Sequence, residues 1–142
     1  PWPWASWPRH RDAGPEPAPG RGSDSVRRVS ADPDCLFCKI IAGDIPSDMV
    51  YRGDRVVAFR DINPVASVHI LVVPVDHHTD VVQLVAKDEP LLAEVVTVAG
   101  ELAKAEANGQ FRLMFNTGAE AGQSVFHVHA HVLAGSKIGI PG

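Results

Sequence analysis

The sequence has little of what marks secreted or membrane proteins. Its 142 residues include only two cysteines, Cys35 and Cys38, which excludes a small scaffold held together by several disulfides. No apolar run approaches the roughly 18 residues of a membrane-spanning helix. The first thirty residues also lack the continuous apolar segment of a signal peptide. We therefore expect a cytoplasmic protein with no membrane partner.

Positive charge is also scarce over most of the chain. The net charge is −4 overall, and residues 31–142 carry eight basic and fourteen acidic residues, a net charge of −6. Non-specific binding of nucleic acid needs clustered Lys and Arg. We therefore expect no nucleic-acid partner, although local hydrogen-bond donors can still hold a small anion.

Residues 1–30 have almost no aliphatic side chains. They hold six of the twelve prolines and all three tryptophans, and such a composition cannot pack a core. We predict a disordered tail over residues 1–30. The folded part is expected to be one domain over residues 35–142.

Hydrophobic periodicity predicts five strands and two helices. The strand-like runs lie at residues 49–52, 55–60, 68–75, 110–116 and 125–133. A short helix is expected at residues 35–42, ending at Gly43, and a long one follows Asp88, with its apolar residues at helical spacing. The pattern predicts an α+β domain: a five-stranded antiparallel meander sheet, with the long helix on one face, and a short N-terminal helix.

Three histidines alternate in the run His127-Val128-His129-Ala130-His131-Val132-Leu133. Side chains on a strand alternate between faces, so the three imidazoles should line one face about 6.6–6.8 Å apart. The intervening apolar residues can then be buried on the other face. Imidazole changes charge near neutral pH and acts as a nucleophile or metal ligand. We therefore expect the functional site on this strand.

Residues 35–135 resemble the histidine triad superfamily, whose signature is His-φ-His-φ-His-φ-φ with φ apolar; HVHAHVL matches every position. The flanking runs CLFCKIIAGDIPSDMVYRGDRVVAFRDINP and NTGAEAGQSVFHVHAHVLAG resemble the Hint branch of purine nucleoside phosphoramidases. The resemblance implies a HIT-like fold and a homodimer in which two sheets join. It also implies hydrolysis of nucleoside 5′-monophosphates that carry an amine or another leaving group on phosphorus.

The resemblance implies a role for each matching residue. His129 is the nucleophile that forms a nucleotidyl-histidine, His131 helps to bind the phosphoryl and leaving groups, and His127 supports the site from the side. His69 matches a fourth histidine that faces the triad. The remaining matches are phosphate contacts at Ser124, Asn116 and Gln123, a ribose contact at Asp61, and a purine pocket of Phe37, Ile40, Phe59, Ile62 and Leu71.

Simpler interpretations stand beside these roles. His69 alone would more often be a structural histidine with its hydrogen bonds satisfied. Asp61 precedes Pro64 closely and could simply start a turn. The phenylalanines and Leu71 could be ordinary core residues, or core and pocket wall together.

The pair Cys35-Leu-Phe-Cys38 is ambiguous. Two thiolates are too few for a structural zinc, which takes four ligands, and no thioredoxin-like βαβ unit follows to support a redox pair. Resemblance to some bacterial histidine triad proteins implies that His77 and His127 complete a tetrahedral set for Zn²⁺, a suitable ion for two thiolates and two imidazoles. Reduced thiols without metal are the alternative, and His78 is a weaker candidate ligand. Catalysis itself is expected to need no cofactor.

The expected ligands are purine nucleoside monophosphates and their phosphoramidates. One alternative is a dinucleoside polyphosphate hydrolase, but the related Fhit-type enzymes have Pro-Arg after the triad, where this chain has Ala134-Gly135-Ser136. A second is a nucleotide-binding or scaffold protein with little turnover. A third is a plain metal site formed by the three strand histidines. The branch also often ends in a tryptophan that reaches the partner's site, whereas this chain ends in Ile138-Gly139-Ile140-Pro141-Gly142.

Overall fold

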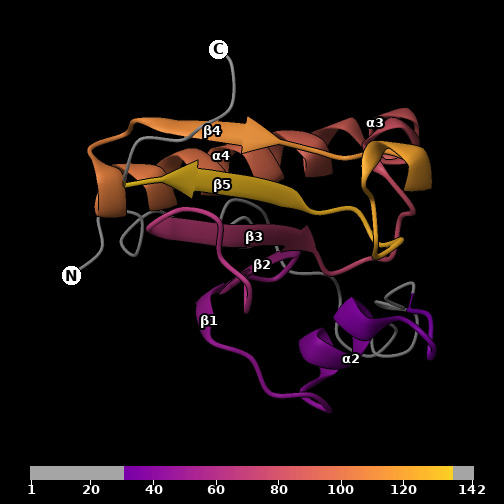
Figure 1. Ribbon diagram of the computed structural model, residues 1–142. Helices are drawn as coiled ribbons and strands as arrows, with labels where there is room; N and C mark the ends of the chain where they lie inside the picture. The colour runs from indigo at the N-terminus through magenta and orange to yellow at the C-terminus, as the bar shows by residue number, and fades with distance from the viewer. Residues whose placement is uncertain (1–30, 136–142) are drawn as a thin grey trace, which may run out of the picture.

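The computed structural model describes residues 31–135, so the predicted tail at 1–30 lies outside the described residues. Its helices are α2 (Leu36–Ala42), α3 (Val81–Lys87) and α4 (Glu89–Ala107), with a 3₁₀ turn η3 (Ala119–Ala121) (Figure 1). Its strands are β1 (Met49–Arg52), β2 (Val56–Arg60), β3 (Val68–Pro74), β4 (Phe111–Met114) and β5 (Ala130–Ala134). Among these helices, none is long and apolar enough to cross a membrane.

The strands form one antiparallel sheet in the order β1-β2-β3-β5-β4. The predicted α+β class and five-stranded antiparallel sheet are confirmed, but the simple meander is wrong beyond β3. The chain crosses through α3 and α4 to the edge strand β4 and then returns, so that β5 lies between β3 and β4 (Figure 1). Burial explains this order, because β5 is almost entirely buried and suits a central place, whereas every residue of β4 is half-buried.

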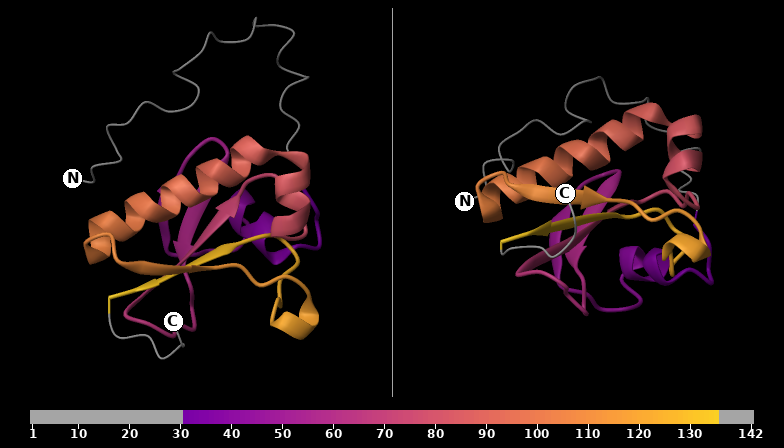
Figure 2. Two further views of the ribbon diagram at one scale, coloured as in Figure 1. Left: turned by 90° about the horizontal axis from the view of Figure 1, so that it is seen from above. Right: turned by 45° about the horizontal axis from the view of Figure 1, so that its top comes forward.

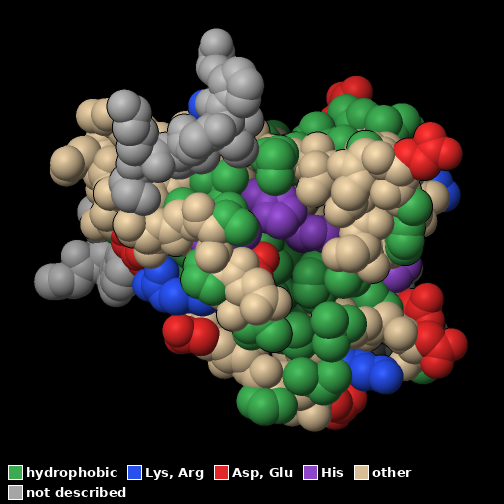
Figure 3. Space-filling view, viewed as in Figure 1, with side chains coloured by type: hydrophobic (Ala, Val, Ile, Leu, Met, Phe, Trp, Pro, Cys, Tyr) green, Lys and Arg blue, Asp and Glu red, His purple; other side chains and the backbone are tan. Residues whose placement is uncertain are grey.

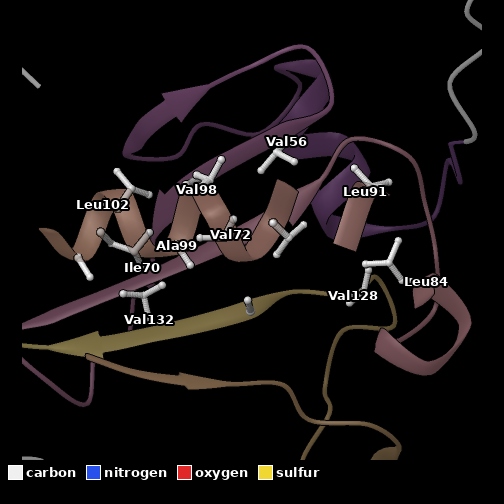
Figure 4. Close-up of a cluster of buried hydrophobic side chains, with 14 residues drawn as sticks. Val56, Ile70, Val72, Leu84, Leu91, Val98, Ala99, Leu102, Val128 and Val132 are labelled. Atoms are coloured by element: carbon white, nitrogen blue, oxygen red, sulfur yellow. The ribbon is translucent and has the colours of Figure 1, made fainter. Parts of the chain in front are cut away.

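One face of the sheet packs against α4 around a cluster of aliphatic side chains (Figure 4). The predicted helical stripe supplies Leu91, Val95 and Leu102, all fully buried. Val128 and Val132 of the histidine run lie in the same cluster, as predicted. Each such side chain contributes roughly 1.5–3 kcal/mol on burial, so this core holds the histidine segment against the helix.

The opposite face packs against α2, so the sheet lies between two helical layers (Figure 2). Phe37 and Ile40 of α2 pack with Phe59 and Leu71 of the sheet. The helix ends, as predicted, at Gly43, whose φ of 88° lies in the left-handed region that glycine adopts readily. This second core positions α2 over the face that carries the histidines.

Two helix boundaries follow local signals. The Asp88 carboxylate accepts a hydrogen bond from the Leu91 amide at 3.1 Å and so begins α4 where predicted. Asp80 caps α3 in the same way, through the Gln83 amide at 2.9 Å. The sequence analysis missed α3 because it is short and buries only Leu84, which leaves no apolar stripe to detect.

The last strand begins at Ala130, five residues later than predicted, so His127 and His129 precede it. The ladder with β3 stops at the pair Val72 and Ala130. Beyond it, Pro74 has no amide hydrogen to donate, and the Val128 amide instead donates to the His78 carbonyl at 2.8 Å. His127 and His129 therefore lie outside the ladder, whereas His131 remains paired with Leu71.

Candidate active site and metal cluster

Histidine side chains gather in a hollow at the centre of one face of the molecule (Figure 3). His131 lies opposite Leu71 in the β3–β5 ladder, and its ring centroid is 5.0 Å from that of His129. His69 comes from β3, with its ring centroid 5.2 Å from that of His131. The structure therefore brings the predicted fourth histidine to the triad.

A cavity of about 350 Å³ opens beside these rings. It brings together most of the predicted site residues: Phe37, Ile40, Phe59, Asp61, Ile62, Leu71, Asn116, Ser124, His129 and His131. Sequence reasoning missed other lining residues, chiefly Ile45, Pro46 and Ser47 in the loop after α2. That loop has no pattern of its own to reveal it, and only its position after Gly43 could have suggested it.

His129 is held as a neutral imidazole with a free nitrogen. Its Nδ1 lies 2.8 Å from the carbonyl oxygen of His127. Because a carbonyl only accepts, Nδ1 carries the proton and donates, which leaves the lone pair on Nε2. Burial lowers the pKa of His129. The ring is therefore suited to nucleophilic attack.

Phe37 serves as core and cavity wall together. Its ring meets His129 edge-on, with centroids 4.9 Å apart and planes at 90°, and meets Phe59 at 5.4 Å and 72°. Such edge-to-face contacts are favourable for aromatic pairs. Phe37 thus packs against the edge of the His129 site and presents an apolar surface to the cavity.

Asp61 forms a turn and also lines the cavity. One carboxylate oxygen accepts a hydrogen bond from the Asn63 amide at 2.8 Å, as in a turn. The other lies 3.4 Å from Nε2 of His69, and the residue lines the cavity. The turn therefore leaves the carboxylate available at the cavity edge, next to Ile62, which is 88% exposed.

Gln123 does not reach the cavity, in contrast to its predicted phosphate contact. Its Oε1 accepts from the Gly118 amide at 2.8 Å, and its Nε2 donates to the carbonyls of Thr79 at 2.7 Å and Val125 at 3.1 Å. The buried amide is thus occupied by backbone groups. These hydrogen bonds stabilise the loop that carries Ser124.

The predicted metal ligands form one compact cluster. The ligand atoms of Cys35, Cys38, His77 and His127 all lie within 4.8 Å of one another. Sγ of Cys38 is 3.5 Å from Nδ1 of both histidines, Sγ of Cys35 is 3.5 Å from Nδ1 of His127, and the two Nδ1 atoms are 3.2 Å apart. His78 is outside this cluster.

These separations fit a tetrahedral ion. Zn–S bonds of about 2.3 Å and Zn–N bonds of about 2.0–2.1 Å place S and N ligands about 3.5 Å apart and two N ligands about 3.3 Å apart. Nε2 of His127 lies 2.8 Å from the Pro74 carbonyl, so it carries the proton and Nδ1 is free to bind a metal. The donor set and its geometry therefore suit Zn²⁺.

Burial favours the neutral forms of Cys38 and His127 in this cluster. Burial raises the pKa of the Cys38 thiol to about 11, with Cys35 adding to the shift. Burial also lowers the pKa of His127 to about 4. A bound dication would lower the pKa of the Cys38 thiol, because thiols bind metal as thiolates.

The three triad histidines do not share one ion-binding group. Among residues 31–135, His127 groups with the cysteines, whereas His131 groups with Asp61 and His69. His129 belongs to neither group. This separation counts against a plain metal site built from the three triad histidines.

The chain is similar in sequence to a family model and to several known proteins. A family model described as "Scavenger mRNA decapping enzyme C-term binding" matches residues 34–139. The chain is 43% identical over 106 residues to the purine nucleoside phosphoramidase of Escherichia coli K12, covering 73% of this chain and 89% of that one. It is 39% identical over 100 residues to protein HitA of Neisseria gonorrhoeae, covering 70% and 94% respectively.

Solved structures give the same picture. A HIT family hydrolase from Clostridium thermocellum superposes with a TM-score of 0.73 at 37% identity, covering 78% of this chain and 98% of that one. A histidine triad protein from Clostridium difficile superposes with a TM-score of 0.72 at 42% identity and the same coverage.

Proposed function

This chain belongs to the histidine triad family of nucleotide hydrolases, and from that premise we propose that it cleaves the P–N bond of purine nucleoside 5′-phosphoramidates. One observation supports this above the others. His129 presents a free Nε2 to a cavity that also holds a carboxylate and apolar walls. The phosphoramidase relative in E. coli adds support for the substrate class.

The proposed reaction has two displacements at phosphorus. Nε2 of His129 forms a bond to the α-phosphorus as the P–N bond breaks, and the departing nitrogen takes up a proton from solvent and leaves as the neutral amine. Water then attacks the nucleotidyl-histidine: its oxygen bonds to phosphorus and gives up a proton to solvent, and the P–Nε2 bond breaks, returning its electron pair to His129 and releasing AMP or GMP. Two such steps have lower barriers than one direct attack by water.

Transition-state charge on the phosphoryl oxygens needs donors around it. Ser124 and Asn116 line the cavity near His129 and supply a hydroxyl and an amide. We assign the sugar hydroxyls to Asp61 and the purine to the apolar wall around Phe37 and Phe59. A planar base stacks well against such a wall.

We also propose that the Cys35, Cys38, His77 and His127 cluster holds a structural Zn²⁺. The support is the agreement of its distances with tetrahedral geometry. The ion would tie α2 to the ends of β3 and the histidine segment. Both described cysteines are reduced, which suits the reducing cytoplasm that we propose as the location.

We further propose a homodimer in which two sheets join across a two-fold axis. β4 is an edge strand of half-buried residues, and an unpaired edge offers backbone groups to a second chain. Val96 of α4 adds an exposed apolar side chain. A closed two-fold pairing would cover both surfaces without further growth.

Single-turnover chemistry tests the proposed function. Adenosine 5′-phosphoramidate should give AMP and a transient adduct whose mass maps to His129. A nucleotide-binding protein with little turnover would bind AMP and accumulate no adduct. Faster cleavage of a dinucleoside polyphosphate than of the phosphoramidate would instead favour that alternative substrate.

A further inference from the structure

Cys35 and Cys38 face each other across one turn at the start of α2. Cys35 caps the helix, and its Sγ accepts a hydrogen bond from the Cys38 amide at 3.4 Å. Residues three apart in a helical turn have Cα atoms about 5 Å apart, within the roughly 4.4–6.8 Å that a disulfide spans. Both are free thiols. The backbone therefore holds two sulfurs where they can bond to each other without unwinding the helix.

The two sulfurs also connect α2 to distant parts of the chain. Sγ of Cys38 contacts Nδ1 of His77 and of His127, and Sγ of Cys35 contacts Nδ1 of His127, across 39, 89 and 92 residues respectively. Two thiolates on a tetrahedral ion lie about 3.8 Å apart, whereas disulfide sulfurs lie about 2.05 Å apart. A disulfide would therefore leave only two imidazoles, too few to hold the proposed Zn²⁺, and would release α2 from this connection.

Phe37 lies between the two cysteines in the chain, inside the loop that a disulfide would close. Its ring centroid is 4.9 Å from that of His129 and 5.4 Å from that of Phe59. The same ring lines the cavity. The state of the two sulfurs is therefore one residue away from the apolar wall to which we assign the purine.

We propose that Cys35 and Cys38 are a site of reversible oxidation, where a peroxide forms a disulfide that loosens α2 and weakens nucleotide binding in the cavity. The effect on binding rests on the proposed function, because it assumes that the purine lies against Phe37. The disulfide acts only within this chain, so a thioredoxin-like βαβ unit is not required. Disulfides of a reducing compartment are usually transient and redox-sensing, in agreement with thiols that start reduced.

Hydrogen peroxide is the oxidant that balances the reaction. One sulfur, as its thiolate, attacks a peroxide oxygen. The S–O bond forms as the O–O bond breaks, which gives a sulfenic acid, and the departing hydroxide takes up the thiol proton as water. The second thiolate then attacks the first sulfur, the S–S bond forms, and the S–O bond breaks to release a second water. The sulfurs lose two electrons in all, and exchange with a reducing thiol returns both to their starting state.

The site suits a small oxidant. The side chains of Cys35 and Cys38 are buried, with 8% and 9% of each residue exposed, and His77 beside them is half-buried. A peroxide molecule is small enough to approach through such an opening, whereas a second protein chain is not. We therefore expect the two sulfurs to bond to each other and not to another copy of the chain.

The experiment treats the full-length wild type with hydrogen peroxide and then with dithiothreitol. Peptide mapping should place a disulfide between Cys35 and Cys38, and amide hydrogen exchange should rise in α2. Calorimetry should show AMP affinity falling about fivefold, the size of one lost aromatic contact. Dithiothreitol should restore both properties, which separates the disulfide from methionine sulfoxide, since that product needs its own reductase.

Two variants isolate the cause. Cys35→Ser keeps one sulfur and cannot form the bond, so peroxide should leave its AMP affinity and α2 exchange as they were before treatment. Phe37→Leu keeps both cysteines and should form the disulfide as the wild type does. Its AMP affinity should change by less than about twofold on oxidation, because the aromatic contact is already absent.

The wild type alone can overturn the proposal, whether or not a variant folds. Sulfinic acids or a bond between two chains, with no bond between Cys35 and Cys38, would contradict it. A disulfide that leaves α2 exchange and AMP affinity unchanged would do the same, as would a fivefold loss on oxidation of folded Cys35→Ser or Phe37→Leu. If the untreated wild type does not bind AMP, the proposed function fails, while the disulfide and the exchange of α2 still decide whether this site is oxidised and loosens the helix.

Discussion

The backbone carbonyl of His127 accepts a hydrogen bond from Nδ1 of His129 at 2.8 Å, while the side chain of His127 points into the cysteine cluster. One residue therefore serves two sites through different atoms. Its carbonyl orients the nucleophile, and its Nδ1 is free for a metal because Nε2 is held by the Pro74 carbonyl. Substitution of the side chain should separate these two effects.

His129→Asn should abolish hydrolysis of adenosine 5′-phosphoramidate, because only this imidazole bonds to phosphorus. AMP affinity should stay within about tenfold, or ~1.4 kcal/mol, since the cavity walls supply most ground-state binding. His127→Asn is the matched control. It keeps the backbone carbonyl that orients His129, so turnover should fall much less. Near wild-type hydrolysis by His129→Asn, or an adduct on His131, would refute the assignment.

The protein should contain about one equivalent of zinc per chain when purified without chelators. Cys38→Ser should lose the ion and lower stability by about 3 kcal/mol or more, since metal binding and folding are coupled. At roughly 4–8 °C per kcal/mol for a domain of about 100 residues, Tm should fall by at least about 12 °C. His78→Ala should keep both zinc and Tm. Metal analysis that finds no zinc in the wild type would reject the site.

The sequence predicted the elements that depend on local signals. Asp88 caps α4 and Gly43 ends α2, and each acts on its own backbone neighbourhood. The strand order was not predictable from such signals, because the insertion of β5 between β3 and β4 depends on pairing between distant segments. The late start of β5 depends likewise on Pro74, far away in sequence.

The same distinction applies to the site. The triad follows from the motif, and most of the cavity wall was implied by the resemblance to the histidine triad family, but the direction of an amide or the tautomer of a ring depends on long-range contacts. Gln123 donates to a carbonyl 44 residues away, and His69 meets His131 across 62 residues. No local pattern encodes either contact.

Gln123→Ala should destabilise the protein without removing a substrate contact. It leaves the Gly118 amide and the carbonyls of Thr79 and Val125 without their partner, at a cost of about 1–3 kcal/mol. Ser124→Ala should do the reverse, lowering kcat with stability nearly unchanged. Urea unfolding and steady-state kinetics on both variants test the distinction. If Gln123→Ala had wild-type stability but a large loss of kcat, the result would instead support a contact between Gln123 and the phosphate.

Sedimentation should show a dimer at micromolar concentration, because the exposed edge of β4 can pair with a second copy. On dilution the dimer should dissociate directly into monomers. Assemblies larger than the dimer should not appear, because they would require an open pairing rather than a closed two-fold one. A species of monomer mass throughout the range from about 1 to 100 µM would count against the joined sheets.

Stability should fall as the pH drops from about 6.5 towards 4. Burial, followed by the nearby His129 and His69, lowers the pKa of His131 from 6.5 to about 4. Between these values the unfolded chain binds a proton that the folded chain does not, so acid favours unfolding. After allowance for solvent screening, this one group should account for about 2 kcal/mol across the interval. The comparison with His131→Asn isolates it, since both proteins share every other titrating group. The variant should lose less stability than the wild type between pH 6.5 and 4, measured by urea unfolding at each pH. Parallel losses in the two proteins would show that His131 binds its proton equally well in both states.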